Sequence, residues 1–435
     1  MSNEVGPVSE APPIPGMPAP RSGGERHGRA AFAFIFITVA LDMVALGIII
    51  PVLPRLIVQF EHGDMAKAAT QTGVFAFVWA AMQFVFAPVM GALSDRFGRR
   101  PVVLLSNFGL GCDYVLMALA PTLSWLFVGR VISGITAASI PTANAYIADV
   151  TPEEQRAAKF GMLGAAFGLG FIVGPAIGGF LGGYGLRYPF WASAILSLAN
   201  GLYGLFILPE SLPKERRSAF SVKRANPLGA LKLLGSHREL AGFAVAMFLY
   251  YNAHESLPSM YVLYTDYRYH FSPQLTGYAF TGVGVGSTIV SAFLISFAIK
   301  RVGEARTLYT GWLCGVAGFA VLAAAPTGGI SLISLPLLSL WGLGSPAMQS
   351  LMTKRVDKTA QGQLQGALMS MFGVAGMIAP LVFTEVFAVA ISPKWGIHLP
   401  GAPYWLAAIL MAASLAIASN VTRRASLSMA ATTTD

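Results

Sequence analysis

Long apolar segments recur along almost the whole chain, with short polar segments between them. A helix of about 20 apolar residues is long enough to cross the roughly 30 Å hydrocarbon core of a bilayer. The pattern therefore predicts twelve membrane-spanning helices. The predicted spans are 30–53, 70–93, 101–120, 124–148, 159–184, 187–208, 239–265, 275–299, 306–325, 329–351, 364–390 and 402–420.

The polar segments divide this all-α membrane protein into two bundles of six helices. The longest interruption, at 209–238, is predicted to be a cytoplasmic loop between an N-terminal bundle at 30–208 and a C-terminal bundle at 239–420. Residues 1–29 are rich in Pro, Gly and Ser and contain no apolar core of a signal peptide, so we expect a disordered cytoplasmic tail. A second cytoplasmic tail is predicted at 421–435.

Basic residues are distributed unevenly between the two sides of the predicted spans. If the termini are cytoplasmic, 23 of the 29 Lys and Arg residues lie on that side, as basic loops do in membrane proteins. The opposite side holds Arg55, Lys67, Arg187, Arg268 and Lys394. The net charge of +9 therefore reflects topology and contact with anionic membrane lipids, and it gives little support to nucleic-acid binding. We expect a monomer.

An internal repeat relates the two predicted bundles at an offset of 205 residues. The matched positions are Gly98 with Gly303, Pro141 with Pro346, Gly161 with Gly366, and Gly174-Pro175 with Ala379-Pro380. Parallel six-helix repeats with a substrate site near mid-membrane are typical of major facilitator transporters. The repeat thus predicts a major facilitator fold made of two pseudo-symmetric bundles.

A short charged segment joins the second and third spans. Gly91 allows a close helix contact, Gly98 allows a positive φ, and Asp95 lies beside Arg96 and Arg99. Charges of this kind form a gate latch when their bonds exist in one conformation and break in another. The alternative is that the arginines only set topology. The complete spacing is that of the signature loop of the major facilitator superfamily.

The fifth span contains many small residues three or four positions apart, which leaves one helix face nearly smooth. Within it, Gly174-Pro175 is followed by two further glycines, and Pro175 removes one backbone hydrogen bond. This form resembles a motif of antiporters in the same superfamily, which favours export. Close packing alone is the alternative explanation for the glycines.

Three ionisable residues, Asp42, Asp113 and Arg130, fall inside predicted spans at about 17–21 Å from the cytoplasmic helix ends. A charge near mid-bilayer costs about 2.5 kcal/mol or more, which favours a functional role. We predict that these residues couple transport to protons: the aspartates bind and release them, and Arg130 changes the proton affinity of an aspartate as it moves. A static ion pair of Asp113 with Arg130 is the alternative.

Four further polar residues are weaker candidates. Gln83 in the second span and His254 with Glu255 in the seventh are predicted to contact substrate, as is Asp42. Gln83 could equally join helices. Glu385, near the outer end of the eleventh span, is explained as well by a side chain that reaches the interface.

With these residues assembled, the chain resembles the bacterial tetracycline/proton antiporters of the drug/proton branch. The resemblance rests on Leu41-Asp42, Ile50-Pro51-Val52-Leu53-Pro54, Gln83, Asp95 to Pro101, Asp113-Tyr114, Gly129-Arg130, Ser133 to Thr136, Ile147-Ala148-Asp149, Phe167 to Gly170 and Leu364-Gln365-Gly366.

The resemblance implies a proton-driven exporter in the bacterial inner membrane that works by alternating access. It implies that Asp42 and Asp113 are functional carboxylates, that Gln83 lies on the substrate path, and that Asp95 and Asp149 belong to the cytoplasmic gate. The exported species would be a tetracycline chelated to a divalent metal, exchanged for a proton, and no resident cofactor is expected.

The C-terminal bundle departs from that family. Its eighth span reads Val283 to Thr288 and its ninth Cys314-Gly315, where the family has a histidine and an aspartate. His254 and Glu255 are hypothetical replacements. An exporter of another drug or of a metabolite, with or without proton coupling, therefore stays open.

Other classes of protein have less support. The six histidines are scattered, and we find neither a nucleophile with its base nor a metal-ligand cluster, so an enzyme and a metal site are not expected. A transceptor is a further alternative, although the predicted tails are short. Fold by itself does not determine function.

Overall fold

The computed structural model describes residues 22–137, 139–218, 238–357, 360–396 and 398–432. Over these ranges the chain is helical and has no strand, and eleven helical segments are long and apolar enough to cross a membrane. The predicted seventh span is also a helix, α9 (Arg238–Tyr269), of 32 residues. It is less apolar than the others because it contains Asn252, His254 and Glu255. The all-α membrane fold is therefore confirmed.

The elements follow the predicted order. The N-terminal bundle consists of α1 (Ser22–Ile49), α2 (Leu53–Phe60), α3 (Met65–Phe97), α4 (Arg99–Leu119), α5 (Leu123–Thr136), α6 (Ser139–Val150), α7 (Glu153–Gly182) and α8 (Tyr188–Ile207). The C-terminal bundle consists of α9, α10 (Pro273–Ile289), α11 (Ile295–Val302), α12 (Glu304–Ala324), α13 (Gly328–Leu332), α14 (Ser334–Leu340), α15 (Gly344–Thr353), α16 (Gln361–Ile391) and α17 (Ala402–Thr432). Several spans are built from two or three of these elements because a turn or an irregular helical segment interrupts them.

Helices continue past the predicted spans at both ends of the described chain. Helix α1 begins at Ser22, inside the tail predicted at 1–29, and α17 continues to Thr432, inside the tail predicted at 421–435. The helices extend in this way because an existing helix gains one hydrogen bond for each further residue at little cost. Helix α1 thus replaces the disorder predicted for 22–29, while the cytoplasmic location of both tails stays a prediction. Residues 1–21 and 433–435, and residues 219–237 of the loop predicted at 209–238, lie outside the described residues.

The internal repeat is confirmed at the level of single backbone positions. Helices α4 and α12 begin and end at the same places when shifted by 205 residues, and so do the starts of α5 and α13. The predicted positive φ of Gly98 is 107°, and its counterpart Gly303 has a φ of 83°. Both residues directly precede a helix, where they form the tight turn after the preceding span.

Arginines complete the ends of the two related helices. Arg187 donates to the carbonyl oxygens of Ala118 (2.6 Å) and Ala120 (2.8 Å) at the end of α4. Arg268 donates to the carbonyl oxygen of Ala323 (2.7 Å) at the end of α12. The last carbonyls of a helix have no partner within the helix, and a cation also interacts favourably with that end. These contacts explain the presence of Arg187 and Arg268 on the side of the membrane that was predicted to have few basic residues.

A polar residue caps the start of α3 and of α10. Asp64 Oδ1 accepts from the backbone N–H of Lys67 (3.0 Å), and Ser272 Oγ accepts from that of Leu275 (3.2 Å). Each cap pairs one of the free N–H groups of a helix start. The hydrogen bond from the Lys67 backbone N–H lowers the pKa of the Asp64 carboxyl.

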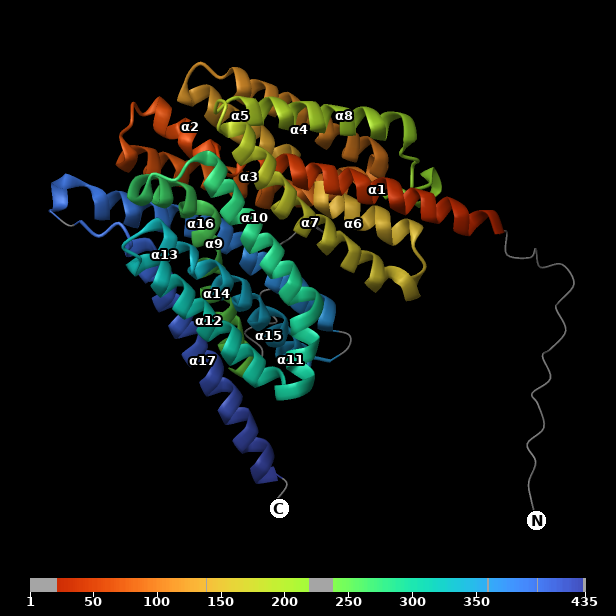
Figure 1. Ribbon diagram of the computed structural model, residues 1–435. Helices are drawn as coiled ribbons and strands as arrows, with labels where there is room; N and C mark the ends of the chain where they lie inside the picture. Colours follow the sequence, from red (N-terminus) through yellow and green to blue (C-terminus); the bar gives the residue numbers. More distant parts are fainter. Residues whose placement is uncertain (1–21, 138, 219–237, 358–359, 397, 433–435) are drawn as a thin grey trace, which may run out of the picture.

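The two bundles meet at one end and diverge at the other (Figure 1). Helix α3 packs on α16, and α7 packs on α10. Near the end with α2, a Cβ on Gly179 would lie 2.6 Å from the Pro273 carbonyl oxygen, whereas Cβ positions on Gly161, Gly164 and Gly91 have nothing within 4 Å. We call the first the closed end and the other, at the α3–α4 turn, the open end. The close contact predicted for Gly91 is therefore not made in this conformation.

The smooth face predicted for the fifth span packs against α1. A Cβ on Gly174 would lie 2.5 Å from the Cα of Gly47, and one on Gly178 would lie 2.7 Å from the carbonyl carbon of Ile48. Backbone therefore meets backbone, as small residues permit in membrane helices. Pro175 lies within α7 between these contacts.

Gly178→Ala is expected to destabilise the protein, because the added methyl group overlaps the α1 backbone, which cannot move as a flexible side chain would. Overpacking of this kind typically costs about 1–3 kcal/mol. Thermal unfolding followed by the loss of monodisperse protein in detergent measures the effect. The matched control is Gly164→Ala on the same helix, which has open space and should unfold at the wild-type temperature. Equal unfolding temperatures for the two variants would contradict the α1–α7 packing.

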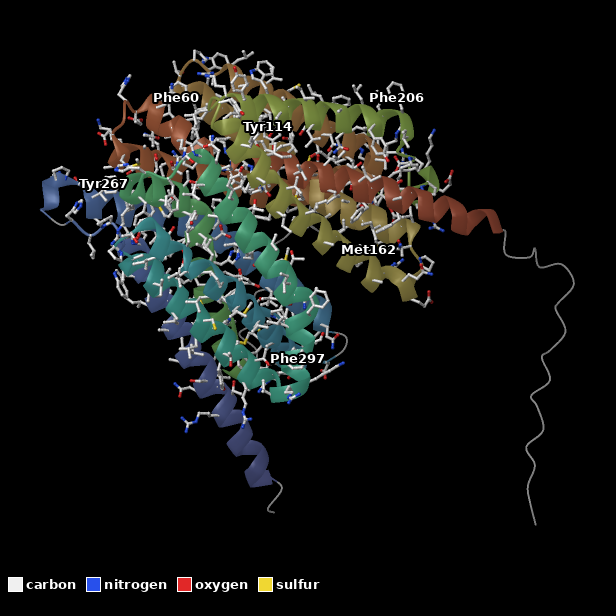
Figure 2. All side chains as sticks on the ribbon, in the orientation of Figure 1. Phe60, Tyr114, Met162, Phe206, Tyr267 and Phe297 are labelled. Carbon is white, nitrogen blue, oxygen red and sulfur yellow. The ribbon has the colours of Figure 1, made fainter. Side chains whose placement is uncertain are left out.

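Large aromatic side chains lie both between the helices and on the outside of the bundles, as expected of a membrane protein (Figure 2). Tyr114 is fully buried among the helices, while Phe206 and Phe297 are 81% and 62% exposed on the outside. Exposed aromatic residues on the outside of a bundle suit contact with lipid rather than water.

Candidate functional site

Asp113 and Arg130 lie inside the N-terminal bundle, on α4 and α5. They are 1% and 6% exposed, Arg130 interacts electrostatically with Asp113, and the Ser133 side chain lies near Asp113. Both oxygens of Asp113 lack a hydrogen-bond partner at ordinary distance, as do Nε and Nη1 of Arg130 and Oγ of Ser133. A polar group left unpaired in a membrane bundle is costly. This arrangement is poised to accept a proton or a new partner.

The static ion pair considered for Asp113 and Arg130 is not formed in this conformation. Within the described residues, no carboxylate oxygen lies within 4.0 Å of the Arg130 guanidinium. The guanidinium carbon instead lies 5.2 Å from the centroid of the Trp79 ring, which is a cation–π contact. Gly129 leaves the space that Asp113 occupies, since a Cβ there would lie 2.7 Å from Asp113 Oδ1.

Asp42 points toward α8 and not toward the opening between the bundles. It is 5% exposed, and its Oδ1 accepts from Asn200 Nδ2 (2.9 Å), which also donates to the Thr38 carbonyl oxygen (2.9 Å). Tyr114 interacts electrostatically with both Asp42 and Asp113. Sequence reasoning missed Asn200, although a single amide inside an apolar span is a signal for such a partner. In this conformation the geometry suits Asp42 for proton binding better than for substrate contact.

Gln83 lies on α3, one helical turn after Trp79, and it is half-buried. Its neighbour Phe84 is next to Gly373 on α16, where a Cβ would come within 3.0 Å of the phenyl ring. Gln83 therefore lies on the helix that carries both the Trp79 ring beside Arg130 and the Phe84 ring at the contact between the bundles. Its role in substrate binding stays a prediction.

His254 and Glu255 lie near the middle of α9. Their side chains are 45% and 16% exposed, and His254 Nδ1 lies 3.7 Å from Glu255 Oε1. Among the described residues, His254 is the one ion partner of Glu255 within 4.0 Å. A carboxylate at this depth without an arginine or lysine partner retains the capacity to bind a cation.

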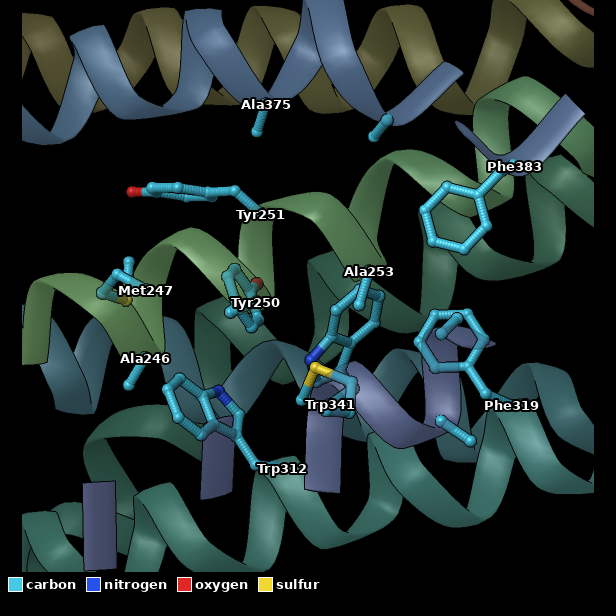
Figure 3. Close-up of a cluster of buried hydrophobic side chains, with 14 of the residues drawn as sticks. Ala246, Met247, Tyr250, Tyr251, Ala253, Trp312, Phe319, Trp341, Ala375 and Phe383 are labelled. Carbon is cyan, nitrogen blue, oxygen red and sulfur yellow. The ribbon is translucent and has the colours of Figure 1, made fainter. Parts of the chain in front are cut away.

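Aromatic rings form one wall beside His254. The ring centroids of His254 and Trp341 are 5.3 Å apart, and Tyr250 lies 5.1 Å from Trp341 and 5.5 Å from Trp312. Figure 3 shows Tyr250 beside both tryptophans, with Phe319 further along the cluster. This packing holds the α9 backbone firmly at the position of the histidine. The sequence showed the rings but not that α9, α12 and η5 (Trp341–Leu343) bring them together.

The charged turn between α3 and α4 forms a network at the open end. Arg99 is 8% exposed; its Nε donates to Asp149 Oδ2 (3.1 Å), and its Nη1 donates to Ser94 Oγ (2.7 Å) and to the Asp95 carboxylate. Arg96 is exposed and lies over the ring of its neighbour Phe97. Three of the predicted gate residues, Asp95, Arg99 and Asp149, thus meet, while Arg96 stays outside the network.

Glu210 completes this network and was missed by sequence reasoning. Its Oε1 accepts from the backbone N–H groups of Arg99 (2.8 Å) and Leu212 (3.0 Å), and its Oε2 lies 3.7 Å from Arg217. A carboxylate at a helix start accepts hydrogen bonds from free N–H groups, and the positive end of the helix dipole stabilises its negative charge. Glycine is required at Gly98 because its φ of 107° is strained for residues with a Cβ, and a Cβ there would also lie 2.8 Å from the carboxyl carbon of Glu210.

Two repeated six-helix bundles with ionisable groups buried at mid-depth define a secondary transporter of small molecules. The chain belongs to the Major Facilitator Superfamily, whose sequence profile matches residues 35–384. It is therefore a multi-span membrane transporter.

Sequence relatives indicate which members of the superfamily the chain is similar to. The chain is similar to the tetracycline resistance protein, class C, of Escherichia coli, with 37% identity over 362 residues that cover 83% of this chain and 91% of that protein. It is also similar to the class G protein of Vibrio anguillarum, with 35% identity over 360 residues (83% and 91%), and to the class B protein of Escherichia coli, with 34% over 358 residues (82% and 88%). These matches confirm the resemblance inferred from the motifs.

Solved structures support the fold. The human organic anion transporter MFSD10 (TETRAN) matches with a TM-score of 0.65 and 22% identity, covering 90% of this chain and 99% of that chain. The nucleoside transporter NupG matches with a TM-score of 0.67 and 16% identity, covering 90% and 98%. At these identities the likeness confirms the major facilitator fold and nothing about substrate.

Proposed function

We propose that this chain is a proton-coupled antiporter that exports tetracycline-like drugs across the bacterial inner membrane. The observation that carries the proposal is the buried Asp113, whose carboxylate oxygens lack hydrogen-bond partners although Arg130 lies nearby. The tetracycline resistance proteins that match most of the chain support the substrate class. The distribution of basic residues supports cytoplasmic termini, so that the open end faces the cytoplasm.

The bundles would alternate between this conformation and one in which the other end opens. When Asp113 is ionised, Arg130 stabilises its charge; when a proton binds, Arg130 is released to its contact with Trp79. The protein exchanges a proton for the drug if the proton and the drug compete to drive the same conformational change of the two bundles. Asp42 is a second protonation site in this scheme, held by Asn200 and linked to Asp113 through Tyr114.

The C-terminal bundle would supply the substrate site. Glu255 offers a carboxylate with no arginine or lysine partner within 4.0 Å among the described residues, and His254 is half-exposed beside it. These groups favour a cationic substrate, such as a tetracycline chelated to a divalent metal. The metal in this scheme is part of the cargo. Within the described residues, no group of three or more His, Cys, Asp or Glu side chains is placed to hold a metal ion of the protein itself.

We propose that the protein catalyses no reaction, needs no resident cofactor, and works as a monomer in contact with lipids. Gln83, on the helix α3 that packs on α16, would line the substrate path from the N-terminal side.

Purified protein in liposomes that contain a pH-sensitive dye tests the function. With an imposed pH gradient, addition of tetracycline and magnesium should release protons from the acidic lumen, whereas magnesium alone should not. Proton release with another drug or a metabolite and none with tetracycline would overturn the substrate class. No proton movement with any compound that is itself transported would overturn the coupling.

A further inference from the structure

Arg55 joins the two bundles at the closed end. It lies on α2, whose residues Leu56 and Ile57 are buried in the hydrophobic core of the N-terminal bundle. Helix α2 is therefore a fixed part of that bundle, and the Arg55 side chain extends from it toward the C-terminal bundle. The side chain is 11% exposed.

Within the described residues, the hydrogen-bond and ion partners of Arg55 all belong to the C-terminal bundle. Its Nη1 lies 2.8 Å from Asp266 Oδ1, and its Nη2 donates to the Phe271 carbonyl oxygen and to Thr276 Oγ1 (3.4 Å). These acceptors lie at the end of α9, in the α9–α10 turn and in the first turn of α10. One guanidinium thus holds three separate parts of the opposite bundle, which its planar fork of donors allows.

A second contact crosses the same end on its other side. Thr70 Oγ1 on α3 donates to Glu385 Oε2 on α16 (2.9 Å). Glu385 is therefore more than a side chain that reaches the interface. Neither contact is compatible with separation of α2 and α3 from α9, α10 and α16, which opening of this end requires.

We propose that Arg55 is the positioning residue that holds the two bundles together at the closed end, and that its bonds to the C-terminal bundle break in each transport cycle. Among the basic residues predicted on the outer side, Lys67 offers a contrast, because it forms an ion pair with Asp64 of its own bundle and its side chain is 71% exposed. Arg55 thus differs from Lys67 in the bundle to which its partners belong, and not in its charge.

Cysteine labelling tests this without substrate or proton gradient, so its outcome is independent of the proposed function. The background is full-length protein with Cys112→Ser and Cys314→Ser. Ala69→Cys reports on the closed end, because Ala69 on α3 is fully buried in the hydrophobic cluster of the C-terminal bundle. Gly164→Cys reports on the open end, where a Cβ has nothing within 4 Å.

Arg55→Gln is expected to raise the labelling rate of the Ala69→Cys reporter by an impermeant maleimide about tenfold, which corresponds to about 1.4 kcal/mol. The same change should lower the labelling of the Gly164→Cys reporter. Asp266→Asn should act in the same direction, Arg55→Lys should act less because it retains the charge, and Lys67→Gln should have no effect. Unfolding would raise labelling at both reporters, so opposite changes distinguish a shift in conformation from damage. Unchanged labelling at the closed end in Arg55→Gln, or a rise at both ends, overturns the proposal.

Discussion

Asp113→Asn is expected to abolish drug-driven proton release from liposomes while exchange of labelled for unlabelled drug continues. The amide has the shape of the carboxylate but cannot take up a proton. Because the Asp113 oxygens have no hydrogen-bond partner at ordinary distance, the change breaks no bond of this kind. At a pH difference of about two units, one proton per drug molecule sustains at most about a 100-fold drug gradient, or about 2.7 kcal/mol. The variant should lose this gradient completely.

The comparison needs variants that separate coupling from folding. Asp357→Asn changes an exposed carboxylate and should behave as wild type. Asp113→Asn together with Arg130→Gln removes both buried charges, so it shows whether an unbalanced Arg130 damages the fold. If Asp113→Asn still accumulates drug against its gradient and Asp42→Asn does not, the proton site is Asp42, and the role given to Asp113 is wrong.

Glu255→Gln is expected to weaken binding of a tetracycline–magnesium complex by about 10- to 100-fold. A hydrogen bond to a charged group contributes about 1.5–3 kcal/mol, and the glutamine amide keeps the shape but loses the charge. Binding of a neutral drug that competes for the same opening should change far less. Equilibrium binding to purified protein in detergent, at constant pH and salt, measures both.

Two controls make this result specific to the site. Glu215→Gln alters an exposed acid of η1 (Lys214–Arg216), outside the membrane spans, and should bind as wild type does. His254→Gln should leave the charge of Glu255 in place and reduce affinity less than Glu255→Gln does. Equal affinities of wild type and Glu255→Gln for the complex would show that this carboxylate is not a cation site.

Local features were largely predictable from the sequence. The membrane spans are predictable because each must supply enough apolar length to cross the lipid. The turns at Gly98 and Gly303 are predictable because glycine tolerates their positive φ. The meeting of Arg99 with Asp95 was predictable for a similar reason, since the two lie four residues apart around one short turn. The extensions of α1 over 22–29 and of α17 over 421–432 were not predictable, because the distance that a helix continues past the lipid depends on weak local energies.

Partners of the buried polar groups were harder to predict. Asp42 was recognised as an intramembrane carboxylate, yet its contact with Asn200 joins residues 158 positions apart. Glu210 looked like a polar residue of a loop, and only the folded chain places its carboxylate at the start of α4. In both cases the sequence showed a group that needs a partner and could not show which partner it finds.

The sequence by itself thus determined the membrane class, the two related bundles, the transporter family and the list of ionisable groups within the spans. The tertiary structure alone decided that Asp113 and Arg130 lie close without an ion pair, that Asp42 faces α8, and that Arg55 reaches Asp266 across 211 positions of sequence. The reason is physical. Hydropathy and turn geometry act over a few residues, whereas the partners of a buried charge depend on how separate helices rotate and pack against one another.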